Sequence, residues 1–291
     1  MKHVSIRHSA TLPLIFSLLF GAAITLSAQV DSGPPKVLII QREYLKPGKA
    51  GSTHERSESA FVRAMTAAKW PTHYFGLDSA SGPSRSLFFT GYPSFAAWEK
   101  DNLDTRKNAT LSAALDRASV ADGELLSEYD QNAFIFRDDL SFNTGNLTGK
   151  RYMEISQFVA KPGHTQDLEA LAKLYVEGYK KAGLDTNFAT FQLMYGTNTS
   201  DVFIVITTLK SLSETDKEIG LNEQFVKAMG ESGMKKVNDL AAASIESSMT
   251  NLYEINPKIS YPPDEWVKAD PDFWKPKPTA APAAKPAPPA Q

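Results

Sequence analysis

The stretch IQREYLKPGK, residues 40–49, decides the fold, because a similar stretch, ISQFVAKPGH, recurs at residues 155–164. Each is a run of strand-forming residues closed by Lys-Pro-Gly, and the two triplets begin at Lys46 and Lys161, 115 positions apart. Proline fixes φ near the value that the second position of a type II turn needs, and glycine accepts the positive φ that follows. Each copy therefore predicts a strand, a tight turn and then an amphipathic helix.

The order of elements repeats along the rest of the chain. The first copy, residues 36–142, predicts strands at 37–45, 72–76, 85–92 and 132–137, with a short helix after Ser94 and a helix at 109–128. The second copy, residues 151–261, predicts strands at 151–159, 188–195, 202–207 and 251–255 and a long last helix. Leu87 and Val202 are again 115 positions apart, as are Leu125 and Leu240. Several landmarks at one offset predict an internal duplication of a β-α-β-β-α-β unit.

A unit that opens with Arg42-Glu43-Tyr44 and Lys-Pro-Gly-Lys, and carries the aromatic helix start Ser-Phe-Ala-Ala-Trp at 94–98, resembles the dimeric α/β-barrel superfamily. That superfamily includes antibiotic-biosynthesis monooxygenase-like, NIPSNAP-like and stress-responsive barrel proteins. The resemblance implies an α+β fold in which two tandem ferredoxin-like units pack their sheets into one intramolecular barrel. It also implies a monomer with an internal pseudo-dimer, since one chain supplies both halves.

The two ends of the chain are of a different kind. Residues 1–28 predict a signal peptide: a positive start, an apolar run and a small-residue cleavage point after Ala28. The apolar run is short for an uncleaved membrane anchor, which is the alternative, and no later stretch is apolar enough to span a membrane. We expect a secreted or periplasmic protein, with linkers at residues 29–35 and 143–150.

Residues 262–291 are rich in Pro, Ala and Lys and predict a disordered tail. A spacer, or a basic arm for an anionic envelope surface, is the functional alternative. Trp266 and Trp274 are candidates for anchoring the start of this tail to the folded domain.

Composition excludes several classes of function. The formal charge of −2 gives no basic face for nucleic acid. The absence of cysteine excludes disulfides, thiolate metal sites and cysteine nucleophiles. No glycine-rich phosphate loop and no serine-centred nucleophile elbow occurs. His54 and His164 follow the two turns, where exposed polar residues are ordinary, and no pair of histidines has ligand spacing, so we expect no metal and no cofactor.

Candidate catalytic residues lie at the end of the first strand and the start of the second. Alternation along residues 37–45 puts Arg42 and Tyr44 on one face and Glu43 on the other. An Arg and a Tyr pointing into a cavity could hold an acidic or phenolic ligand; the ordinary alternative is an ion pair between Arg42 and a neighbouring carboxylate. The second copy has Gln-Phe-Val at 157–159 instead, so a site there has lost or changed its chemistry.

His73 is the third catalytic candidate, because it begins a strand expected to line the cavity. It could act as a base or, as the resemblance allows for some relatives, as a haem ligand; a partly exposed strand-start histidine is the ordinary alternative. Aromatic residues are candidates for an apolar ligand pocket, although most aromatics belong to cores. The pocket candidates are Trp70, Tyr74, Trp98 and Tyr195.

Three functions follow from these features. The first is an exported barrel protein that binds a small apolar or aromatic molecule. The second is an enzyme, either a cofactor-independent monooxygenase or isomerase or a haem-handling protein. The third is a structural or assembly protein of the cell envelope.

Overall fold

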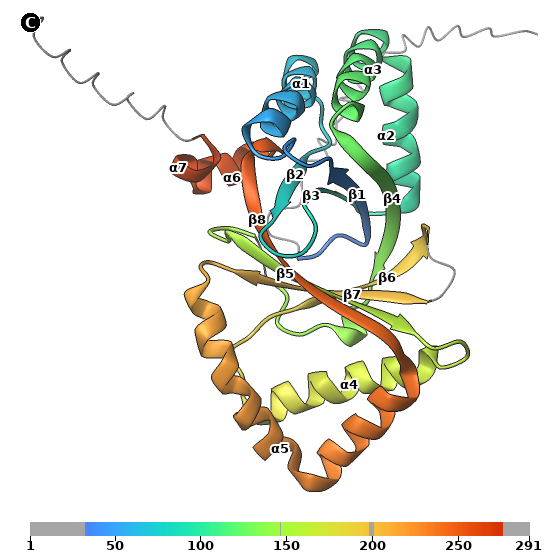
Figure 1. Cartoon of the computed structure of the whole chain (residues 1–291), viewed down its shortest axis with the longest axis vertical. Coiled ribbons are helices and arrows are strands. Elements are labelled where there is room, and N and C mark those ends of the chain that lie inside the picture. Colours follow the sequence, from blue (N-terminus) through green and yellow to red (C-terminus); the bar gives the residue numbers. More distant parts are fainter. Residues whose placement is uncertain (1–32, 146, 198–200, 276–291) are drawn as a thin grey trace, which may run out of the picture.

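The computed structural model describes residues 33–145, 147–197 and 201–275. The predicted signal peptide and the end of the predicted tail lie outside these residues. Within them the chain forms two β-α-β-β-α-β units that share one closed antiparallel barrel (Figure 1). In the part of the chain that is described, no helix is both long and apolar enough to cross a membrane.

The first unit consists of β1 (Val37–Leu45), α1 (Ser52–Ala68), β2 (Tyr74–Ser79), β3 (Arg85–Tyr92), α2 (Phe95–Lys107), α3 (Ala109–Gly123) and β4 (Leu126–Phe136). A short 3-10 helix, η1 (Asp138–Leu140), leads to the second unit. The second unit consists of β5 (Tyr152–Ala160), α4 (Thr165–Ala182), β6 (Ala189–Tyr195), β7 (Val202–Leu209), α5 (Ser213–Ser244) and β8 (Ile245–Tyr261). Two short helices follow, α6 (Asp264–Ala269) and α7 (Pro271–Trp274).

The strand order is the same in both units. It is β4-β1-β3-β2 in the first and β8-β5-β7-β6 in the second, which is the ferredoxin-like order. Two seams close the barrel: β2 pairs with β8, and β4 pairs with β6. At the first seam Leu77 lies opposite Ile255. Gly76 is required there, because a Cβ on it would lie 2.5 Å from the Ile259 side chain. The predicted α+β barrel of two ferredoxin-like units is confirmed.

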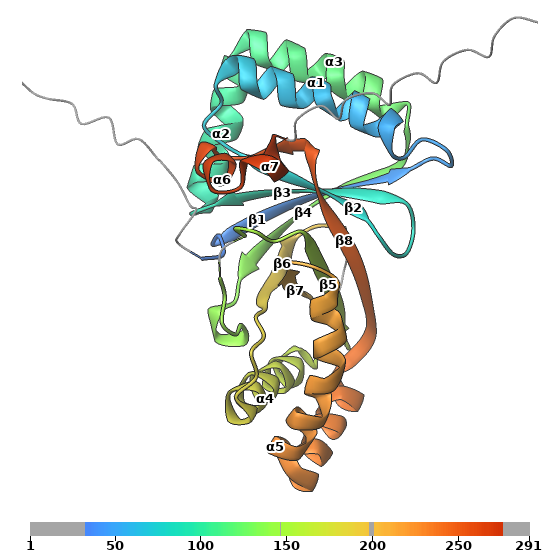
Figure 2. The same ribbon diagram turned by 90° about the vertical axis from the view of Figure 1, so that its left-hand side faces the viewer.

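Two helical layers lie on opposite sides of the barrel, α1 to α3 over the first sheet and α4 and α5 over the second (Figure 2). Side chains alternate between the barrel interior and these layers. The interior is a single apolar cluster to which all eight strands contribute: Leu38, Ile40, Leu77, Leu87, Phe89, Phe134, Met153, Ile155, Phe191, Ile204, Ile206, Tyr253 and Ile255. Burial of each such side chain stabilises the fold by about 1.5–3 kcal/mol.

Both Lys-Pro-Gly triplets form the predicted tight turns. Gly48 has φ +76° and Gly163 has φ +82°, the positive values that the turn requires. The N–H of Lys49 donates to the Lys46 carbonyl at 3.0 Å, and that of His164 donates to the Lys161 carbonyl at 2.9 Å. The turns therefore set where α1 and α4 begin.

Residues 264–274, which the composition assigns to the tail, form α6 and α7 and pack against the barrel. Trp274 is buried in the interior cluster, and Trp266 packs against it, as predicted. Arg151 holds the segment from the second unit, with its guanidinium 2.5 Å from Asp270 and 4.0 Å from the Phe273 ring centroid. Aromatic burial therefore continues the ordered chain beyond residue 262.

Three element boundaries differ from the sequence prediction. The helix expected at 109–128 ends at Gly123, and β4 begins at Leu126 because it pairs with β1. The strand expected at 72–76 occupies Tyr74–Ser79. The last strand, expected at 251–255, occupies Ile245–Tyr261, since it pairs with β5 along one part and with β2 along the other.

Candidate functional site

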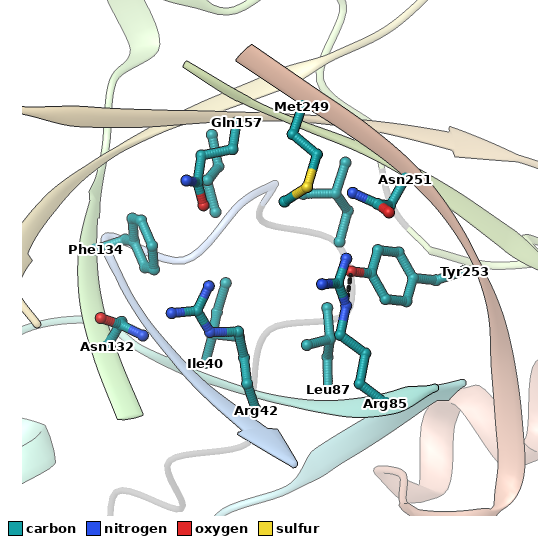
Figure 3. A pocket seen from close by; sticks show the side chains of 12 residues that line it. Ile40, Arg42, Arg85, Leu87, Asn132, Phe134, Gln157, Met249, Asn251 and Tyr253 are labelled. Carbon is teal, nitrogen blue, oxygen red and sulfur yellow. Dashed lines mark hydrogen bonds between the residues drawn. The ribbon is translucent and has the colours of Figure 1, made fainter. Parts of the chain in front are cut away.

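A small cavity opens inside the barrel, lined by residues from both units. Figure 3 shows its polar and apolar walls, with the Arg42 and Arg85 side chains pointing into the space. Its volume is ≈ 40 Å³, which is room for about three water molecules. The lining residues are Ile40, Arg42, Arg85, Leu87, Asn132, Phe134, Ile155, Gln157, Ile204, Met249, Asn251 and Tyr253.

Arg42 enters the cavity already paired. Its Nε and Nη2 donate to the two oxygens of Asp130 on the neighbouring strand β4, at 2.7 and 2.6 Å. Asn132 donates to the same carboxylate at 2.8 Å. Such a bidentate pair fixes the guanidinium plane and neutralises its charge. The ion pair that was the ordinary alternative for Arg42 is present.

Arg85 enters the cavity without a carboxylate. It is 4% exposed, and among the residues that the structure describes no carboxylate forms an ion pair with it. Its Nε donates to the Tyr253 hydroxyl at 2.6 Å, and its guanidinium lies 5.3 Å from that ring's centroid. Burial raises the pKa of Tyr253, so this hydroxyl stays neutral beside the guanidinium. A buried cation with only neutral partners attracts an anion.

The two units contribute unequally to the cavity. Ile40 lies opposite Asn132 and Ile155 opposite Asn251, so the two asparagines occupy matching positions. The charged residues have no such match. Arg42 and its partner Asp130 correspond to Gln157 and Met249, and Arg85 corresponds to Val202. The sequence match of Leu87 with Val202 is wrong, because the strand register pairs Leu87 with Arg42 and Ile204 with Gln157, so Leu87 corresponds to Ile204.

The three catalytic candidates do not meet in the cavity. Arg42 lines it. Tyr44 lies beside it, with the Arg85 guanidinium 5.7 Å from its ring. His73 stacks on Tyr261 with ring centroids 4.7 Å apart, and burial lowers its pKa. His73 does not line the cavity because the start of β2 packs against the end of β8.

The four aromatic pocket candidates do not line the cavity either. Trp70 ends α1 and donates to Asp101 at 2.9 Å. Trp98 packs against Phe95 within α2, and Tyr195 is 62% exposed. Tyr74 faces the helical layer, where its ring contacts Phe88. Alternation along β2 turns Tyr74 away from the barrel interior. Trp70 and Trp98 lie outside the strands, and Tyr195 follows a register shift in the pairing of β4 with β6.

A second charged site lies in the helical layer of the first unit. Glu43 on β1, His54 and Glu58 on α1, and Asp122 on α3 are all buried, and one ligating atom from each lies within 4.8 Å of the others. We call these four residues the acid–histidine cluster. The expectation that His54 is exposed is wrong: it is 2% exposed, because the first turn of α1 faces the sheet. His164 is half exposed, as expected.

Within this cluster His54 is the only cationic partner. Its Nε2 lies 2.9 Å from Glu43, 3.7 Å from Asp122 and 3.8 Å from Glu58. Burial, the largest single cause, lowers the pKa of His54, but the hydrogen bond to Glu43 and the negative charges of Glu43, Asp122 and Asp78 together outweigh burial and raise the pKa. Burial raises the pKa of Glu58 well above its usual value, and the neighbouring Glu43 and Asp122 add to this. These side chains are of the types that hold metal ions.

Sequence reasoning missed Arg85 and the cluster, although signals for both exist. Arg85 alternates with Leu87 and Phe89, which places it on the barrel face of a strand. His54 and Glu58 are four residues apart and so share one helix face. Asp122 is far away in the sequence, and only the packing of α3 beside α1 brings it in.

No protein-family model and no curated protein sequence matches this chain. Among solved structures it is similar to a candidate monooxygenase from Fusobacterium nucleatum, with 9% identity, a TM-score of 0.48 and coverage of 75% of this chain and 91% of the other. It is also similar to an anthrone oxidase-like protein (12% identity, TM-score 0.46, coverage 75% and 90%). A third is a variant chlorite dismutase from Candidatus Nitrospira defluvii (10% identity, TM-score 0.46, coverage 80% and 95%). At these values no activity can be transferred, and the fold assignment rests on strand order and barrel closure.

Proposed function

We propose that this chain is an exported single-chain barrel protein that binds a small anionic molecule inside its barrel. The observation that carries the proposal is Arg85, a buried guanidinium in the cavity wall that has no carboxylate partner among the described residues. Burying a cation is costly unless it is paired, so a bound anion would relieve that cost.

The walls of the cavity suggest the chemistry of the ligand. Arg85, Asn251 and Gln157 offer donors from three strands, while Leu87 and Phe134 offer apolar contacts. A compact carboxylate fits this mixture and the volume of ≈ 40 Å³. A larger aromatic ligand, as the sequence suggested, would need the Met249 side chain at the rim to turn aside.

Titration calorimetry with a panel of small carboxylates and phenols tests the proposal. We expect Arg85→Met to weaken binding about 10- to 100-fold, the usual effect of losing a charged hydrogen-bond donor. Arg63→Met is the matched control, because it removes the same charge from the exposed face of α1. Equal affinity in wild type and Arg85→Met, or no binding by any member of the panel, would contradict the proposal.

Export belongs to the same proposal and rests on the signal-like residues 1–28. Its measurement is the intact mass of the protein recovered from the periplasm or medium of its host. The mass of a chain that starts at Gln29 would support cleavage after Ala28. Recovery of the full-length chain from the cytoplasm would contradict export.

We also propose that the two units arose by tandem duplication and that the protein is a monomer. The duplication is supported by the shared strand order and by the two matching asparagines, Asn132 and Asn251. A barrel whose seams close within one chain needs no second copy. In the enzyme alternative, a base in this cavity would have to be another residue, since His73 stacks on Tyr261 outside the cavity lining.

A further inference from the structure

The acid–histidine cluster brings four ligating side chains together from three elements of the first unit. Glu43 comes from β1, His54 and Glu58 from successive turns of α1, and Asp122 from the end of α3. All four are at most 8% exposed. The cluster is separate from the barrel cavity, because Glu43 points to the opposite side of β1 from Arg42.

The negative charge of the cluster exceeds what His54 can neutralise. Three carboxylates face a single imidazole, and in the described part of the chain no Lys or Arg forms an ion pair with any of them. Asp78 lies close by on β2 and adds to the negative field. Buried carboxylates are tolerated when they are paired or when they coordinate a metal.

Three buried oxygens in this region lack any hydrogen-bond partner. They are Glu58 Oε1, Asp122 Oδ1 and the Tyr74 hydroxyl. Glu58 and Asp122 are 3% and 2% exposed, and these two oxygens are the ones that face His54 Nε2. Orphaned oxygens at such depth are rare in proteins and call for an ion or other partner.

The orientation of His54 suits a ligand role. Ser86 donates its hydroxyl proton to Asp78 at 2.5 Å, so its oxygen remains free to accept from His54 Nδ1 at 3.4 Å. This arrangement puts the Nδ1 proton toward Ser86, while the Nε2 proton donates to Glu43. A metal ion would take the place of that Nε2 proton, since Nε2 is the ring atom that faces the three carboxylates. A histidine that binds metal is commonly held in this way by an outer hydrogen bond.

We propose that Glu43, His54, Glu58 and Asp122 bind one divalent transition-metal cation such as Zn²⁺ or Mn²⁺. Bonds of about 2.1 Å in a tetrahedral site separate the ligand atoms by about 3.4 Å. The distances from His54 Nε2 of 2.9, 3.7 and 3.8 Å bracket this value. One imidazole with three carboxylates matches the ligand preferences of these ions.

The depth of the site assigns the ion a structural role. It joins β1, α1 and α3, so it clamps the helical layer of the first unit onto its sheet. The corresponding layer of the second unit is packed by apolar residues instead, among them Phe158, Phe203 and Val237. The polar cluster is therefore not a requirement of this fold.

The test starts from full-length mature protein that has been treated with EDTA and then titrated with ZnCl₂ or MnCl₂. Native mass spectrometry should show one ion per chain. The thermal midpoint should rise by about 5–10 °C when the metal is a hundredfold above its Kd. Wild-type protein that binds no ion, or whose midpoint is unchanged by both metals, would overturn the proposal.

Glu58→Gln keeps the shape of the side chain and removes one ligand charge. We expect it to bind metal at least about 100-fold more weakly than wild type. Glu177→Gln is the matched control, since it makes the same change on the exposed face of α4, and it should bind as wild type does. Equal binding by Glu58→Gln and wild type would overturn the assignment.

A measurement on the wild type alone guards against a variant that does not fold. Co²⁺ bound at the site should shift the ring-proton NMR signals of His54 and leave those of His164 in place. Co²⁺ binding that does not shift the His54 signals would exclude the cluster as the site.

Discussion

The two units of the barrel have the same strand order, but the side chains at several matching positions are charged in the first unit and neutral in the second. Inside the barrel, charged residues of the first unit are matched by neutral residues of the second. The pairs, matched by strand register, are Arg42 and Gln157, Asp130 and Met249, and Arg85 and Val202. Under the helices the acid–histidine cluster is matched by an apolar one. Because the second unit folds without these charges, the fold does not need them, and the presence of Arg85 and of the acid–histidine cluster in the first unit is the basis of the two ligand proposals.

The largest effect should come from placing the charge of the first unit into the second. Val237→Asp buries a carboxylate in the apolar cluster that contains Leu171, Phe203 and Phe158. We expect a loss of about 4 kcal/mol or more in the free energy of unfolding, measured by urea denaturation. Val237→Ala should cost about 2 kcal/mol through the lost methyl groups. Equal losses in the two variants would show that the helical layer of the second unit tolerates a buried charge. The proposed difference between the two units would then be wrong.

Giving the first unit the barrel residue of the second should have a smaller effect. Arg42→Gln leaves Asp130, whose side chain is 9% exposed, without its bidentate partner. We expect a loss of about 2 kcal/mol in the free energy of unfolding. The double variant Arg42→Gln with Asp130→Met copies the second unit fully and should recover most of that loss. A double variant less stable than the single one would argue against the match between these positions.

A smaller effect of opposite sign is expected at Glu58. In the presence of EDTA, Glu58→Leu removes one of three crowded carboxylates and should raise the free energy of unfolding by about 1 kcal/mol. With Zn²⁺ added, wild type should overtake the variant. Urea denaturation under both conditions measures this reversal. A variant less stable than wild type in EDTA would mean that the cluster stabilises the fold without a metal.

The smallest effect belongs to the histidine that follows the second turn. His164 contacts Asp167 at 2.8 Å, and both side chains are nearly half exposed. His164→Ala should change the free energy of unfolding by less than about 0.5 kcal/mol. His54→Ala, made in parallel, should abolish the metal-dependent stabilisation. A large effect at His164 would show that the two turns are more alike in role than their burial indicates.

The sequence predicts the strands and turns of this protein well where they depend on residues that are close together in the sequence. The turn after β1 needs Pro47 and Gly48, and the strand before it needs residues that favour extended structure, so both can be read from ten positions. The start of β4 could not be read in this way. Residues 126–130 favour a helix as much as a strand, and they are extended because Glu128 pairs with Tyr44.

The candidate sites are less predictable because they are not local. Alternation correctly places Arg42 and Glu43 on opposite faces of the strand. No pattern in the sequence predicts that Arg42 pairs with Asp130 or that Glu43 contacts His54. The expectation of no metal depended on spacing between histidines, whereas the acid–histidine cluster contains one histidine and three carboxylates from distant segments. Such a set exists only after α1 and α3 pack side by side.

The seam between β2 and β8 has a consequence for how the protein is made. Leu77 is synthesised early, whereas its partner Ile255 follows only after most of the second unit has been made. Until β6 and β8 emerge, β4 and β2 of the first unit are open strand edges, which are templates for pairing with other chains. Closing so long a loop also slows folding. We therefore expect the unfinished chain to depend on a chaperone that shields it until the barrel can close.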